Sequence, residues 1–336
     1  MPSKKIILLT GAGFTKNFGG LLADEMWAMI FNHKEVQGSD LIRNNMLAEF
    51  NYETVYQKIL DDLKADEDEK TIIKRALLSA YEYQENNWQN NNFFLSIDYR
   101  IINHLCEFIA KHVGLYFTLN HDLFLERKLI HKFSGRSLHL LADPSDIGIQ
   151  GSRSALPNAN DLFNKQSLIK DQLSDISGLC YVKLHGSINW YDSSGKETLV
   201  IVGGNKKEKM KKEPLLNQYY ELFSETLLTP GNQLLVIGYG FMDNHINEVI
   251  IRGIDKKAIK LHIIDVLSPK DFSEKMAQHY PNPKKMSKEE KNGEVIRESI
   301  WLEMSGYYQV NSIRDLFAEN GPKPLIGKLI ENMELN

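Results

Sequence analysis

The stretch Leu179-Cys180-Tyr181-Val182-Lys183-Leu184-His185-Gly186-Ser187 decides the fold class. Its first six residues are mostly apolar and β-favouring, and they run directly into a His-Gly-Ser turn. This pattern is typical of a buried strand in a parallel sheet that carries a polar side chain to its carboxyl end. Ligands of open α/β sheets bind beyond such strand ends, and an imidazole suits proton transfer near neutral pH. His185 is therefore a candidate base, or else a residue that only caps its strand.

Other short apolar runs also end in polar or glycine-bearing turns. Lys5–Thr10 precedes Gly11-Ala12-Gly13, Gly114–Leu119 precedes Asn120-His121-Asp122, and Leu234–Ile237 precedes Gly238-Tyr239-Gly240-Phe241. Lys260–Ile264 closes with Asp265, a carboxylate well placed to accept hydrogen bonds from a ribose. Closely spaced glycines let the backbone approach a phosphate, although a tight turn without a ligand fits equally well. For Asn120 and Asp122 the alternative is to cap a helix that starts at Leu123.

Between the first two strands, residues 21–112 show helical periodicity, with apolar residues three and four positions apart. We therefore predict an α/β protein: a Rossmann-like parallel sheet with flanking helices and a large helical insertion domain. Residues 1–20 and 113–270 form the sheet domain, residues 21–112 the insertion, and residues 271–336 a C-terminal helical extension packed on the core. Thr198–Val202 is expected to be a further strand. The basic run Lys206–Lys212 is expected to be a solvated loop, with a contact for phosphate or nucleic acid as the alternative.

The composition argues against several classes of protein. Hydrophobic residues make up 42% of the chain and charged residues 25%, as in ordinary globular proteins. A net charge of −4 gives no reason to expect direct nucleic-acid binding or contact with an anionic membrane. The two cysteines, Cys106 and Cys180, cannot build a disulfide framework or a cysteine zinc site, and we expect no metal. With neither a signal peptide nor a transmembrane run, the chain is expected to be cytoplasmic.

Taken in order, the four turns resemble those of the sirtuin-like superfamily. The Gly11-Ala12-Gly13 turn, with Thr15 two residues on, is similar to the family's NAD phosphate loop. Asn120 and Asp122 match its Asn-x-Asp motif, which contacts the nicotinamide ribose, and His185 matches its catalytic histidine. Gly238, Tyr239 and Gly240 fall at a cofactor turn, and Asp265 falls near the adenine-ribose residue. The resemblance implies that these residues bind NAD and that Asn120, His185 and Asp122 are catalytic.

The departures from the deacetylating sirtuins indicate a subtype. Those enzymes carry a zinc ribbon with two Cys-x-x-Cys pairs, which this chain lacks, and Leu119 replaces their usual glutamine. The pattern looks more like the bacterial sirtuin-like NAD hydrolases of antiphage defence, which lack the ribbon and carry a large helical insertion. That resemblance implies an enzyme that takes NAD as substrate and destroys it to halt phage replication. It also implies a homo-oligomer with a regulatory partner, such as a hexameric DNA-translocating ATPase or another defence protein.

The implied reaction suits these residue types. Cleavage of the nicotinamide–ribose bond builds positive charge on the sugar, and nicotinamide leaves neutral without needing an acid. Asn120 would orient the water or a ribose hydroxyl, His185 would accept the proton, and Asp122 would orient rather than react. Two alternatives use the same site: transfer of ADP-ribose or an acyl group to a protein, and a nucleotide sensor without turnover. The presence of a base at a strand end favours catalysis, because pure binding has little need for one.

Overall fold

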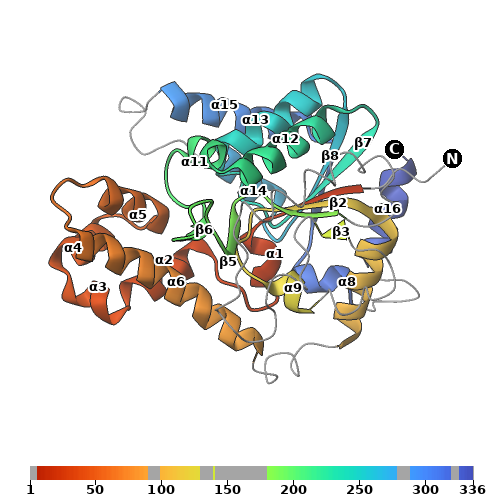
Figure 1. Ribbon diagram of the computed structural model, residues 1–336. Helices are drawn as coiled ribbons and strands as arrows, with labels where there is room; N and C mark the ends of the chain where they lie inside the picture. Colours follow the sequence, from red (N-terminus) through yellow and green to blue (C-terminus); the bar gives the residue numbers. More distant parts are fainter. Residues whose placement is uncertain are drawn as a thin grey trace.

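The computed structural model describes residues 6–89, 99–128, 139–140, 180–277, 288–318 and 325–335. Its centre is a seven-stranded sheet, in the order β3-β4-β2-β1-β7-β8-β9, with every neighbouring pair parallel (Figure 1). The strands are β1 (Ile6–Thr10), β2 (Val113–Thr118), β3 (His139–Leu140), β4 (Cys180–Lys183), β7 (Asn232–Ile237), β8 (Ile259–Asp265) and β9 (Gly306–Gln309). The predicted α/β class with a Rossmann-like parallel sheet is confirmed. Leu179 lies outside the described residues.

Both faces of the sheet are covered by helices, which explains why its strands are continuously apolar. Alternate residues of β1 enter two different cores, Ile7 and Leu9 on one face and Ile6 and Leu8 on the other. The first face packs against α12 (Pro214–Leu228), α13 (Asn244–Asp255), α14 (Pro269–Met276) and α15 (Lys288–Glu303). The second packs against α8 (Tyr99–His112), α16 (Leu325–Leu335) and the 3₁₀ helix η5 (Ile313–Leu316).

The helical insertion has an apolar core of its own, in the lobe at the left of Figure 1. Its helices are α2 (Ala23–Phe31), α3 (Lys34–Gly38), α4 (Asp40–Ala48), α5 (Tyr52–Asp61) and α6 (Glu67–Gln89). Residues such as Ile30, Val55 and Ile73 pack together there. In contrast, Leu105 and Ile109 of α8 pack against the sheet, although the sequence analysis assigned α8 to the insertion. In terms of packing, the insertion therefore ends before α8.

Three segments differ from the sequence predictions. The C-terminal extension was expected to be helical, but it also supplies β9, which pairs with β8 and extends the sheet. Lys206–Lys212 is helix α11 and not a loop. The strand expected at Thr198–Val202 is shorter in the structure, where it is β6 (Thr198–Val200). It pairs antiparallel with β5 (Gly186–Tyr191) in a separate two-stranded sheet. None of the helices in the described part of the chain has the length and apolar character needed to cross a membrane.

The register of the sheet brings the strand ends together along one edge. Thr10 at the end of β1 pairs with Thr118 of β2 and with Ile237 of β7. Thr118 in turn pairs with Lys183, the last residue of β4. After β1 the chain continues to β2 on one side and only later to β7 on the other, and such a reversal opens a crevice at the carboxyl ends of the strands.

Candidate active site

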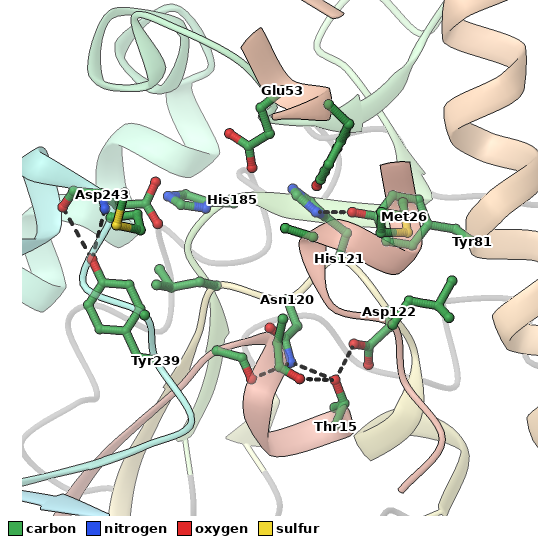
Figure 2. A pocket seen from close by; sticks show the side chains of 18 of the residues that line it. Thr15, Met26, Glu53, Tyr81, Asn120, His121, Asp122, His185, Tyr239 and Asp243 are labelled. Atoms are coloured by element: carbon green, nitrogen blue, oxygen red, sulfur yellow. Dashed lines mark hydrogen bonds between the residues drawn. The ribbon is translucent and has the colours of Figure 1, made fainter. Parts of the chain in front are cut away.

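A pocket lies at this edge, between the turns that follow β1, β2, β4 and β7 and the helical insertion (Figure 2). The predicted site residues that line it are Gly11, Ala12, Thr15, Asn120, Asp122, His185, Tyr239 and Gly240. Gly13, Gly238 and Asp265 are not among the lining residues. Asp265 is buried at the end of β8, where its Oδ1 accepts a hydrogen bond from the Leu267 N–H at 2.9 Å. The three predicted catalytic side chains thus share one cavity.

Gly13 and Gly238 lie where the turns after β1 and β7 touch. The Gly13 N–H donates to the Gly238 carbonyl at 2.9 Å, and a Cβ on Gly13 would lie 2.9 Å from the same oxygen. Gly238 has a φ of +63°, and its Cβ would meet the Phe14 nitrogen at 2.2 Å. The packing of one turn on the other therefore requires these glycines. Because the N–H groups of Gly11, Gly13 and Phe14 are bonded within the protein, phosphate binding by Gly11 and Gly13 stays a prediction.

Thr15, in the short helix α1 (Ala12–Lys16), connects the first turn to the turn after β2. Its Oγ1 lies 3.2 Å from Asp122 Oδ2 and accepts a hydrogen bond from Asn120 Nδ2, also at 3.2 Å. The same Asn120 nitrogen donates to the Gly11 carbonyl at 3.1 Å. Since both amide hydrogens of Asn120 are used in this way, its amide oxygen is the group left for a ligand.

Asp122 combines the two roles that the sequence left open. Its Oδ1 accepts the N–H of Phe124, the first residue of α9 (Phe124–Lys128), at 3.1 Å, while its side chain also lines the pocket. Burial raises the pKa of Asp122 to about 7, although nearby Lys183 acts in the opposite direction. Lys183 forms a buried 2.8 Å ion pair with Glu126 and donates to the carbonyls of His121 and Asp122. This contact holds the turn after β2 in place.

His185 is 2% exposed, and its side chain lines the pocket. Its Nε2 lies 3.0 Å from Nε2 of His245, in the first turn of α13. Burial lowers the pKa of His245 to about 4 and that of His185 well below its ordinary value. Both rings are therefore neutral near pH 7, the form in which an imidazole accepts a proton. The side chain bonds to another ring and not to the strand backbone, which favours the role of base over that of strand cap.

A largely buried ion-pair cluster, which the sequence did not predict, also lies in the pocket. Lys206 Nζ lies 2.7 Å from Asp243 Oδ1 and 2.8 Å from Glu53 Oε2, and only 13% of the Lys206 side chain is exposed. Burial alone would raise the pKa of Asp243, but Lys206 holds it below its ordinary range. The expectation that Lys206 belongs to a solvated loop is therefore wrong, because two carboxylates compensate its charge inside the protein.

The sequence indicates Asp243 and His245 more clearly than it indicates Glu53. Asp243 and His245 follow β7 within eight residues, so the rule that polar groups gather after strand ends would have found them if extended past Phe241. Glu53 lies on α5 of the insertion, and no motif around it in the sequence indicates that it faces the pocket.

His121, between Asn120 and Asp122 in the sequence, also lines the pocket. Its Nδ1 lies 2.9 Å from the hydroxyl of Tyr81, whereas its buried Nε2 has no hydrogen-bond partner among the described residues. Burial lowers the pKa of His121 to about 3, so the ring is neutral. Buried polar atoms in folded proteins are nearly always hydrogen-bonded, so this nitrogen, on a residue that lines the pocket, is a candidate contact for a polar ligand. The Asn120 amide oxygen is a second polar group that a ligand in this pocket can contact.

The prediction that no metal binds remains untested. Within the described ranges, His185, Asp243 and His245 offer ligand atoms that all lie within 4.8 Å of one another. However, the Asp243 carboxylate already pairs with the ammonium group of Lys206, which supplies a positive charge at that position.

Comparison with known families agrees with the geometry. A family model described as SIR2-like domain matches residues 114–289, just over half of the chain. The matched range contains Asn120, Asp122, His185, the Gly238–Gly240 turn and Asp265, whereas the turn at Gly11–Thr15 precedes it. No match was found among curated proteins. The matched family uses NAD, which is compatible with an NAD-dependent enzyme. This chain belongs to the SIR2-like family.

Proposed function

We propose that this protein is an NAD hydrolase that cleaves the nicotinamide–ribose bond to give nicotinamide and ADP-ribose. The observation that carries the proposal is the convergence of Asn120, Asp122 and His185 in one pocket, from the ends of two paired strands. An amide oxygen can hold an attacking water molecule by accepting one of its hydrogens, and a neutral imidazole can accept the other as a proton.

Each residue has a distinct task. NAD, when bound, supplies a positively charged leaving group that departs as neutral nicotinamide while positive charge develops on the ribose. The amide oxygen of Asn120 accepts a hydrogen bond from the attacking water and orients it, and His185 takes the water's proton. Glu53 and Asp243 carry two negative charges against the one positive charge of Lys206. The surplus negative charge stabilises positive charge on the sugar.

The direct test is to incubate the purified protein with NAD and to measure nicotinamide and ADP-ribose by chromatography. Hydrolysis predicts that both products appear in equal amounts. Adenine-labelled NAD distinguishes the alternatives: label attached to protein would indicate a transferase, and bound NAD that is recovered intact would indicate a sensor.

We further propose that the enzyme acts in bacterial antiphage defence by depleting cytoplasmic NAD. In this proposal it is a homo-oligomer controlled by a partner, such as a hexameric DNA-translocating ATPase or another defence protein. The support is the resemblance described above, together with the helical insertion and the lack of paired cysteines for a zinc ribbon. In phage-infected bacteria, cellular NAD should fall in cells that express the protein and stay constant in cells that express a His185→Ala variant.

A further inference from the structure

His245 lies behind the proposed base and is not itself among the pocket-lining residues. Its Nε2 is 3.0 Å from His185 Nε2, and the two ring centroids are 5.2 Å apart. The residue is 6% exposed, and the Tyr220 hydroxyl donates to its backbone carbonyl at 3.0 Å. Among the described residues, His245 provides the one hydrogen-bond partner of the His185 side chain. The position of His245 is therefore fixed, and its hydrogen bond determines which nitrogen of His185 carries the ring proton.

Two neutral imidazoles at this distance share one proton, so one Nε2 donates and the other accepts. If His245 donated, the lone pair of His185 Nε2 would be occupied and its Nδ1 would carry the ring proton. His185 would then have no free lone pair with which to accept a proton. If His185 donates from Nε2, its Nδ1 stays unprotonated and available to a ligand in the pocket. Only the second arrangement makes His185 a base.

We propose that His245 is a positioning residue that accepts the Nε2–H of His185 and thereby keeps Nδ1 as the basic nitrogen. This inference rests on the proposed hydrolase function. In the reaction, an O–H bond of water breaks and its proton bonds to Nδ1 of His185. The water oxygen bonds to the ribose carbon, and nicotinamide leaves with the electron pair of the broken C–N bond. The His185 imidazolium formed in this way donates to neutral His245 through a charge-assisted hydrogen bond, which stabilises it.

Several ionisable groups face this pair from the surrounding elements. They are Asp243 and Glu248 on or next to α13, Lys206 and Lys207 on α11, Glu53 on α5, His121 after β2 and Tyr220 on α12. Asp243 favours a protonated His185, whereas Lys206 opposes it. An acceptor at Nε2 adds to the basicity of Nδ1, so its removal should move the acid limb of the kcat–pH profile to lower pH.

The test compares His245→Leu, which removes the acceptor, with His245→Gln, whose amide oxygen can take the place of Nε2. We expect His245→Leu to lower kcat about 10- to 100-fold with an unchanged KM for NAD. His245→Gln should recover most of that loss. The control is His262→Leu, because His262 is fully buried in β8 and neither ring nitrogen has a partner among the described residues. That control should keep both the wild-type kcat and the wild-type pH profile.

A second measurement does not depend on activity. Imidazole nitrogen NMR of the NAD-free protein should show His185 protonated at Nε2 and His245 protonated at Nδ1. The inference is overturned if His185 carries its proton on Nδ1, if His245 carries its proton on Nε2, or if stoichiometric metal is bound between the two rings. It is equally overturned if His245→Leu cleaves NAD like the wild type, or if His245→Gln is as slow as His245→Leu. A wild-type protein that leaves NAD intact would contradict the proposed function, and the NMR result would then decide the tautomers on its own.

Discussion

The pocket has two walls that are built in different ways. The strand-end wall includes Thr15, Asn120, His121, Asp122 and His185, on turns whose positions follow from the register of the sheet. The insertion wall includes Tyr52, Glu53 and Tyr81, on helices that have an apolar core of their own. Hydrogen bonds connect Thr15 to Asn120 and Asp122 within the strand-end wall. The insertion wall contacts that wall through Tyr81–His121 and contacts α11 through Glu53–Lys206.

This difference assigns separate tasks to the two walls. Side chains that sheet pairing holds in place are suited to the chemical step, because catalysis depends on precise positioning. Side chains on the helical insertion, which packs around its own core, are suited to closing the pocket and balancing its charge. Substitutions of Asn120 and His185 in the strand-end wall should therefore change the rate, whereas substitutions at the contacts between the walls or between the turns should change the stability.

The largest effect is expected for Asn120→Ala in the strand-end wall. Loss of the amide that orients the water should lower the rate of nicotinamide release by about a hundred- to ten-thousand-fold, while the melting temperature changes little. Because Asn120 and His185 act on the same water, the double alanine variant should be little slower than either single variant. Rate losses that multiply in the double variant would show that the two residues act independently.

Lys206→Met tests the contact between the walls. The substitution leaves the partly buried Glu53 and Asp243 carboxylates without a counter-ion, which should cost about 2–4 kcal/mol of unfolding free energy at pH 7. The deficit should shrink toward pH 4, because the unpaired carboxylates then take up protons. Denaturant titrations at several pH values measure it.

The neighbouring pair Lys207–Glu248 is the matched control for that experiment. Its side chains are 41% and 42% exposed, so Lys207→Met should cost less than about 1 kcal/mol. Equal losses for the two lysine variants would contradict a special role for the Lys206 cluster.

Gly238→Ala tests how the turns of the strand-end wall pack on each other. A Cβ at this position would lie 2.2 Å from the Phe14 nitrogen and would require a φ of +63°. We expect a loss of about 2–4 kcal/mol of unfolding free energy. Gly240→Ala is the control, because its Cβ would have no neighbour closer than 3.6 Å. If both alanine variants melt at the same temperature, the close contact between the turns does not exist in solution.

A further effect concerns the pH dependence of stability. The pKa of Asp122 in the folded protein, about 7, lies above the ordinary value of 3.8, so the folded state binds the proton more tightly. Its contribution to stability is therefore greatest below pH 3.8, falls as the pH rises to about 7, and is level above that. Asp122→Asn, which stays neutral, should gain stability relative to the wild type between pH 5 and pH 8. A constant difference in melting temperature over that range would show that Asp122 is ionised throughout.

The sequence predicted the parts of the molecule that depend on local pattern. Apolar strands followed by polar turns are visible in the chain, so the parallel sheet and its clustered turns followed from short stretches. Lys206 was misinterpreted because a run of lysines normally indicates solvent, and the carboxylates that pair with it are distant in the sequence. Strand β9, with the sequence Gly-Tyr-Tyr-Gln, was missed because its residues are only partly buried and have no apolar run. Both errors arise from tertiary contacts that no local window contains.

The most direct test of the central claim measures nicotinamide release and melting temperature on the same preparations of wild-type protein and His185→Ala. The account predicts that the wild type releases nicotinamide from NAD, and that the variant melts near the wild-type temperature but is at least about a hundredfold slower. A His185→Ala protein that cleaves NAD at the wild-type rate would contradict it, whether or not its melting temperature had fallen.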